Sequence, residues 1–221
     1  MASLLPQRKK LSSLFFGGGT PSLMPPKLVE RLITFAEELF GFDPDIEITA
    51  EANPTSVEAA KMLDFQRAGV NRVSMGVQSF DDKTLKFLGR KHSSNEALRA
   101  LDMVRSVFNR VSIDLIYATP GQSATAWRNM LSKALGLGLS HLSLYQLTIE
   151  EGTVFYNRQR RGELMALNDD RAATLYDITQ ELTNAAGLPA YEISNHAAPG
   201  NECQHNMIYW HGGDWIGVGP G

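Results

Sequence analysis

Cysteine, long apolar runs and basic stretches are scarce in this chain of 221 residues. Its only cysteine, Cys203, cannot form a disulfide within the chain, and such cysteine usage favours a reducing compartment. No apolar run approaches the roughly 20 residues that a membrane-spanning helix needs, so no integral membrane segment is predicted. The net charge of −3, without a basic stripe, argues against binding of nucleic acid.

Acidic residues are absent until Glu30, and Arg8, Lys9 and Lys10 make the start of the chain basic. A mitochondrial presequence has similar charge, but the amphipathic Arg/Ser pattern is missing, so we expect residues 1–12 to be a disordered or truncated leader. We predict a cytoplasmic protein, with a mitochondrial location as the alternative. Repeats and low-complexity linkers are also absent, which indicates one domain over residues 13–221.

Five hydrophobic runs alternate with helix-like segments, which predicts an α/β fold built from right-handed βαβ units. The runs are Ser13–Phe16, Ile46–Ala50, Val73–Val77, Val111–Ile116 and His141–Tyr145. They do not alternate cleanly, as expected for parallel strands buried on both faces. Periodicity does not decide between an open sheet and a barrel. In both architectures the carboxyl ends of the strands meet at one rim, where ligands bind.

Helix signals separate the runs. Pro25–Pro26 open a helix whose apolar residues share one face at helical spacing, namely Leu28, Leu32, Phe35 and Leu39. Further helices are predicted after Thr55, after Asp81 and after Ser93, and over residues 124–137 and 168–187. The tail after Gly187 has no regular pattern.

A run of glycines, Gly17–Gly19 followed by Thr20, comes directly after the first hydrophobic run. Three glycines allow close approach of the backbone to a ligand and free several N–H groups to face a charged one. The run matches neither a Walker loop nor the dinucleotide-binding fingerprint. A tight turn before a helix is the alternative explanation.

Polar residues follow or interrupt the later runs. Glu51 could accept hydrogen bonds from a ribose or an amine, or be a solvated acid, and Gln78 could be a satisfied rim amide. Asp114 lies inside a hydrophobic run and is costly to bury unless a cation such as Arg90 or a ligand hydroxyl pairs with it. Arg90 could equally belong to a basic surface turn.

The histidines near the end of the chain do not form a zinc pattern. His196, His205 and His211, taken with Cys203, match no tetrahedral spacing, so no metal site is predicted. His205-Asn206 followed by Tyr209-Trp210 suits a flat aromatic ligand or its iron. No Gly-x-Ser-x-Gly elbow is present and Cys203 has no base partner in sequence, so no catalytic nucleophile is assigned.

The ordered motifs resemble the radical S-adenosylmethionine (SAM) proteins of the oxygen-independent coproporphyrinogen III oxidase group. The matching segments are Phe15–Ser22, Glu51–Pro54, Arg72–Phe80, Leu88–Arg90, Asp114–Gln122 and Leu142–Leu147. Tyr191–Asn195 and His205–Trp210 are similar to the haem-chaperone branch of that group rather than to the oxidases.

This resemblance implies a partial (β/α)6 barrel with SAM and a [4Fe-4S] cluster at the carboxyl ends of the strands. By position, Gly18, Gly19 and Thr20 would hold the methionine amino end of SAM. The rest of SAM would meet Glu51, Gln78, Arg90 and Asp114, with Asp114 at the ribose and Thr148 near the adenine. His205 would lie near haem. The implied function is delivery of haem to haem-requiring client proteins; oxidative decarboxylation of coproporphyrinogen III and a SAM-binding remnant serving as an interaction domain are the alternatives.

One departure from the family pattern concerns the cluster. Family members carry Cys-x3-Cys-x2-Cys upstream of the glycine run, whereas this chain has no cysteine before Cys203, and one thiolate cannot hold the cluster. We therefore expect a fragment, an alternative product or an incomplete gene model that performs no radical chemistry alone. The first barrel strand and the C-terminal domain are expected to be missing, which leaves a sheet edge beside Ser13–Phe16.

Overall fold

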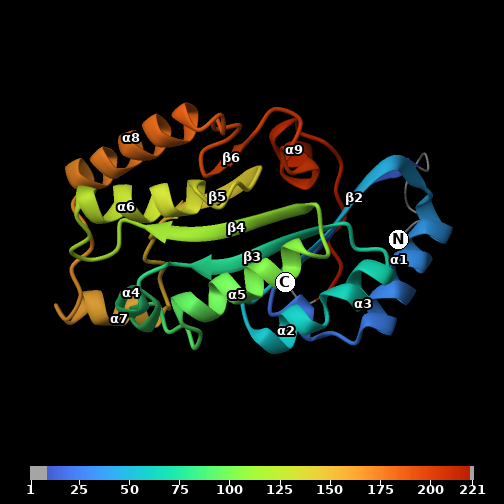
Figure 1. Ribbon diagram of the computed structural model, residues 1–221, viewed down its shortest axis with the longest axis horizontal. Helices are drawn as coiled ribbons and strands as arrows, with labels where there is room; N and C mark the ends of the chain where they lie inside the picture. The colour runs from blue at the N-terminus through green and yellow to red at the C-terminus, as the bar shows by residue number, and fades with distance from the viewer. Residues whose placement is uncertain (1–8, 220–221) are drawn as a thin grey trace. The chain divides into compact units, whose positions relative to one another are not determined.

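A computed structural model describes residues 9–219 (Figure 1). Within this range six strands form one sheet in the order β1-β2-β3-β4-β5-β6. They are β1 (Leu11–Phe16), β2 (Phe42–Ala52), β3 (Arg72–Gln78), β4 (Arg110–Tyr117), β5 (His141–Gln146) and β6 (Asn195–Ala197). β2 pairs in parallel with β1 and β3, and the short β6 is antiparallel to β5. The five hydrophobic runs are thus all strands, and β6 is an addition that the sequence pattern did not predict.

Helices connect the strands as the alternation predicts. They are α1 (Pro26–Phe40), α2 (Ser56–Ala60), α3 (Met62–Arg67), α4 (Asp82–Phe87), α5 (Ser94–Arg105), α6 (Ala124–Leu135), α7 (Val154–Arg160), α8 (Asp169–Ala185) and α9 (Gln204–Trp210), with a 3₁₀ turn η2 (Pro21–Leu23). Two predicted starts are confirmed by capping side chains, because Asp81 accepts from Thr84 N–H and Asn168 accepts from Arg171 N–H. The helix predicted after Thr55 is divided into α2 and α3 at Lys61. The short α7 and α9 were not predicted.

The chain divides into two compact units, and β3 and β4 each run from one unit into the other. The first contains residues 9–76, 95–112 and 202–219, and the second contains 77–94 and 113–201. The core of the first unit comes from α1, α3, α5 and the strands, and includes Val29, Ile33, Met62, Phe65, Val73, Met75 and Leu101. The core of the second includes Leu115, Trp127, Leu131, Leu142, Leu144 and Leu175.

In the second unit, α6 and α8 pack together around Trp127, which is fully buried. Its ring stacks on Tyr117 of β4 at 4.9 Å between centroids, and its indole N–H donates to Thr179 Oγ1 at 2.9 Å. The only polar atom of this large side chain is therefore satisfied, so its full apolar area can stabilise the core.

The apolar face predicted for α1 is not the face that meets the core. Val29 and Ile33 are buried, whereas Leu28, Leu32 and Phe35 are exposed. The helix has two adjacent apolar faces, and periodicity alone does not say which of them packs on the sheet.

The prediction of a leader over residues 1–12 falls mostly on residues 1–8, which lie outside the described residues, and β1 begins at Leu11. Across the described part of the chain, every helix is too short or too polar to span a bilayer.

Candidate functional site

The glycine run forms an exposed turn at the carboxyl end of β1. Gly18 and Gly19 have φ of 73° and 56°, in the left-handed region that glycine tolerates, and a Cβ at either position would meet no atom within 4 Å. The Gly18 N–H donates to Glu51 Oε2 at 3.2 Å. Glu51 is the penultimate residue of β2, the strand that pairs with β1 in the sheet. The structure therefore brings Gly18 and Glu51 together, with Gly19 and Thr20 in the same turn.

In the second unit, backbone strain marks the ends of β3 and β4. Gln78 ends β3 with φ of 67°, and the hydrogen bond from Ser79 N–H to Val77 C=O closes a tight γ-turn around it at 2.8 Å. Ala118 follows β4 with φ of 58°. Such conformations are costly for residues other than glycine and cluster at functional sites. The strained residues Gln78 and Ala118 lie in the segments Arg72–Phe80 and Asp114–Gln122, which carry the family motifs. Backbone strain and sequence motifs therefore point independently to the same strand ends.

The other predicted rim residues of the second unit are more exposed. Asp114 is half-buried within β4, and its charge adds to burial in raising the pKa of the Tyr145 hydroxyl, which places the two side chains near each other. Arg90 is exposed just after α4. Thr148 is exposed beyond β5, where its hydroxyl donates to Gln146 C=O at 3.4 Å. Convergence of all these residues with the glycine run on one SAM site remains a prediction.

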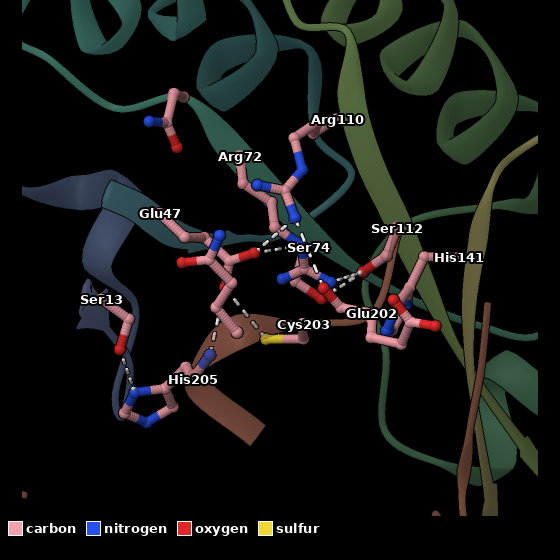
Figure 2. Close-up of polar contacts among 12 residues, drawn as sticks. Ser13, Glu47, Arg72, Ser74, Arg110, Ser112, His141, Glu202, Cys203 and His205 are labelled. Atoms are coloured by element: carbon pink, nitrogen blue, oxygen red, sulfur yellow. Dashed lines mark hydrogen bonds and ion pairs between the residues drawn. The ribbon is translucent and has the colours of Figure 1, made fainter. Parts of the chain in front are cut away.

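His205 lies on α9, which packs against β1 in the first unit (Figure 2). Its Nδ1 is 3.3 Å from Ser13 Oγ, and its ring stacks on Phe15 at 4.7 Å between centroids. Tyr209 meets the ring edge-on at 5.0 Å, and Trp215 lies 5.5 Å from Tyr209. An aromatic row of Phe15, His205, Tyr209 and Trp215 results.

The surroundings of His205 keep its imidazole neutral. Burial lowers the pKa of His205 below its usual 6.5; the Glu47 carboxylate opposes this shift, and the positive charge of Arg72 adds to it. When the Ser13 hydroxyl oxygen accepts the Nδ1 proton, Nε2 carries the lone pair. A neutral imidazole with one nitrogen held in this way is suited to bind a metal through the other.

The start of α9 is held by Glu47, a fully buried residue of β2 (Figure 2). One carboxylate oxygen, Oε1, accepts from the His205 backbone N–H and from the Cys203 thiol, both at 3.3 Å. The N–H groups in the first turn of a helix have no partner within the helix, and the Glu47 carboxylate accepts a hydrogen bond from one of them. Its negative charge also interacts favourably with the positive end of the α9 dipole. Glu47 thus fixes where α9, and with it His205, meets the sheet.

Two arginines compensate the buried charge of Glu47. Arg110 Nη2 donates to Glu47 Oε2 at 2.6 Å, and Arg72 Nε lies 3.8 Å from the same oxygen. Arg72 is itself buried and donates to Ser112 Oγ at 3.4 Å, while Arg110 also donates to Glu202 C=O just before α9. We call Glu47, Arg72, Arg110 and Cys203 the Glu47 network.

Cys203 contributes a hydrogen-bond donor rather than a nucleophile. Its side chain is buried, and burial raises the pKa of the Cys203 thiol above its usual 9.0. The thiolate form is therefore disfavoured at neutral pH, and the thiolate is the form that attacks electrophiles or binds metals.

The Glu47 network was not predicted from the sequence, although one signal for it is present. Glu47 lies between Ile46 and Ile48 in a predicted strand, just as Asp114 lies between two apolar residues. The argument that a carboxylate in such a run needs a partner therefore applies to Glu47 as well. What the sequence does not give is the identity of the groups that contact Glu47, which lie 25 to 158 positions away along the chain.

A surface hollow of about 620 Å³ lies in the first unit at the amino ends of β3 and β4, lined by Pro44, Asn71, Phe108, Arg110 and Gln204 among others. It is therefore not at the strand ends that carry Gly18 and Glu51. Polar atoms line it as much as apolar ones, and in the described residues no group of three or more His, Cys, Asp or Glu side chains is placed to hold a metal ion.

The chain is similar to one family of known proteins. The model of the radical SAM superfamily matches residues 2–134. The mouse protein named radical S-adenosyl methionine domain-containing protein 1, mitochondrial, is 42% identical over 214 residues, covering 96% of this chain and 48% of the relative. The heme chaperone HemW of Escherichia coli K12 is 42% identical over 216 residues, covering 97% of this chain and 56% of the relative. The chain spans about half the length of these curated relatives.

Among solved structures, the coproporphyrinogen III oxidase HemN of Escherichia coli, described as a radical SAM enzyme, matches with a TM-score of 0.73. The match has 24% identity and covers 91% of this chain and 46% of that one. At this identity it establishes the fold alone. The predicted partial barrel is thereby confirmed.

We predict that Glu47→Ala destabilises the protein by about 3–5 kcal/mol, because it leaves Arg72 buried without its counter-charge. The free energy of unfolding in urea measures this. Glu181→Ala is the matched control, since Glu181 pairs with Arg128 at 2.6 Å, the distance at which Glu47 pairs with Arg110, but in an exposed position. Its free energy of unfolding should stay close to that of the wild type. Equal effects of the two substitutions would contradict the role given to Glu47.

Proposed function

Because the chain belongs to the radical SAM superfamily, we propose that it serves haem trafficking, binding haem beside His205 and SAM at the strand ends. The family implies SAM and a [4Fe-4S] cluster as cofactors. The observation that carries the proposal is the neutral, oriented imidazole of His205 within an aromatic row. Client proteins that require haem would be the partners, by analogy with the relatives named heme chaperones.

The residues around His205 fit haem. Nδ1 of His205 is held by Ser13, which leaves Nε2 as the nitrogen for an iron atom. Tyr209, Trp210 and Trp215 are about half exposed, an amount of uncovered aromatic surface that is unusual unless a ligand or partner uses it. A flat porphyrin would bury this surface. Bound haem would supply the iron, and this chain would supply the ligand nitrogen and an apolar face.

The glycine turn and Glu51 fit the amino-acid end of SAM. The turn leaves open space where side chains would stand, and its N–H groups can donate to a carboxylate. Glu51 accepts from Gly18 N–H and presents a carboxylate that can also accept from an ammonium group. Gln78, Arg90, Asp114 and Thr148 complete the proposed SAM site.

The residues of this chain do not fit a [4Fe-4S] cluster. Such a cluster needs several thiolates, and the sequence contains one cysteine, whose thiol is buried and donates to Glu47. We therefore propose no radical chemistry and no decarboxylation of coproporphyrinogen III for this chain. We also propose that residues 13–221 correspond to the barrel core of the larger relatives.

We predict that haem added to the protein gives a shifted Soret band and that His205→Ala lowers haem affinity at least tenfold, because it removes the iron ligand. Spectroscopic titration measures the affinity. His211→Ala is the matched control, since His211 is exposed at the end of the same helix. An unshifted Soret band in the wild type, or equal loss in both variants, would refute the assignment.

We predict that haem binding persists as the pH falls to 6.5 and is lost only below that value. The pKa of His205 is lowered in the folded protein, so its imidazole stays neutral, and able to bind iron, below pH 6.5. Haem titrations across this pH range measure the midpoint. A midpoint above 6.5 would show that His205 is not the titrating ligand.

We predict that Asp114→Ala weakens SAM binding roughly tenfold without loss of thermal stability, because it removes a hydrogen-bond acceptor for the ribose. Isothermal calorimetry and the melting temperature are measured together. Asp177→Ala, on the exposed side of α8, is the control for the change in net charge. Unchanged SAM affinity in Asp114→Ala would argue against the proposed site.

A further inference from the structure

The aromatic row ends beside an ion pair. Phe15, at one end of the row, lies near the carboxyl end of β1, and Trp215 lies at the other end. Asp214, the residue before Trp215, pairs with Lys9, whose Nζ is 2.6 Å from Asp214 Oδ2. Lys9 lies two residues before β1 begins. A flat ligand bound at His205 and lying along the row therefore extends toward the Lys9–Asp214 pair.

Lys9 lies on the same side of the chain as the residues that hold His205. Ser13 and Phe15 both contact the His205 ring, and Figure 2 shows the contact with Ser13. Lys9 precedes them by four and six positions, and side chains an even number of residues apart point to the same side of an extended chain. At about 3.3 Å per residue, Lys9 lies no more than about 13 Å before Ser13. Its ammonium group is thus within the span of a porphyrin whose iron lies at His205.

A tight turn after α9 places Asp214 at this point. The chain turns back in a Schellman motif, in which Gly213 N–H donates to Ile208 C=O at 2.7 Å. A Cβ at Gly213 would lie 2.9 Å from the Ile208 side chain and 3.1 Å from its carbonyl oxygen, so this close turn favours glycine. The turn returns Trp215 to the aromatic row and brings Asp214 to Lys9. A carboxylate is thereby held beside the uncovered aromatic surface.

The Lys9–Asp214 ion pair is exposed and therefore easily exchanged. The two side chains expose 74% and 81% of their surface. Ion pairs with such exposure contribute little to stability, because water solvates the separated charges almost as well. Another carboxylate can thus replace Asp214 at the Lys9 ammonium at little cost. Haem carries its carboxylates together, on propionate arms at one edge of its flat apolar ring.

We propose that Lys9 binds a propionate carboxylate of haem, and that Asp214 is an internal carboxylate that occupies Lys9 when haem is absent. This inference rests on the proposed haem site and names what that site selects, which is an iron porphyrin with free carboxylates. Binding exchanges the Lys9–Asp214 pair for a Lys9–propionate pair, and release reverses the exchange. Because Asp214 returns to Lys9 as haem leaves, haem can be handed on without leaving the ammonium unpaired.

Spectroscopic titration with haem and with haem dimethyl ester, in the same low-salt buffer, tests the proposal. The ester has the same iron and ring but no carboxylate. Lys9→Gln should raise the dissociation constant for haem roughly fivefold and leave the constant for the ester unchanged. Lys10→Gln is the matched control, because Lys10 is the next residue and is also exposed, but lies beside Gly41 instead. It should leave both constants unchanged.

A second pair of variants tests the competition by Asp214. Asp214→Asn should lower the dissociation constant for haem roughly threefold, because Lys9 then has no internal carboxylate to release. In the Lys9→Gln background the same substitution should have almost no effect, since Asp214 acts through Lys9. Both side chains are largely exposed, so all of these variants should keep the melting temperature of the wild type.

The outcomes separate this inference from the proposed function. If His205→Ala abolishes the Soret shift of both ligands but Lys9→Gln leaves haem affinity unchanged, the role of Lys9 is overturned and haem binding at His205 stands. Equal weakening of haem and ester by Lys9→Gln, or equal effects of Lys9→Gln and Lys10→Gln, also overturns carboxylate recognition by Lys9. An equal gain from Asp214→Asn in both backgrounds overturns the competition. A wild type that shifts the Soret band of neither ligand overturns the proposed function and this inference together.

Discussion

The buried charge of Glu47 is the constraint on which the arrangement of the first unit depends. A carboxylate with no exposed surface must be compensated, and in this protein the compensation comes from β3, β4 and the start of α9 together. Residues far apart in the sequence are thereby forced to one point of the sheet. The same contacts that satisfy Glu47 give α9 a fixed place against β1.

The position of His205 follows from that anchoring. With the first turn of α9 bound to β2, the imidazole reaches Ser13 and Phe15 on the neighbouring strand, where burial keeps it neutral. The aromatic residues that follow on α9 remain largely exposed. An oriented, neutral imidazole nitrogen beside uncovered aromatic surface is the arrangement on which we base the proposed haem site.

Much of the fold was predictable because it depends on local signals. Runs of Val, Ile and Leu located the strands from β1 to β5, and capping residues such as Asp81 and Asn168 located helix starts. The motifs also placed the glycine turn and Gln78 at strand ends, and the strained backbone of Gln78 adds support at its position. The buried face of α1 was not predictable, because two adjacent apolar faces compete and only the packing selects one. The Glu47 network was missed because its members are contiguous only after folding.

A crystal structure of this protein grown with haem is the most direct test of haem binding at His205. We expect the iron to be bonded to Nε2 of His205, Ser13 to remain at Nδ1, and the porphyrin to lie against Tyr209 and Trp215. Iron bound instead to His196, His211 or Cys203, or haem bound away from α9, would contradict it.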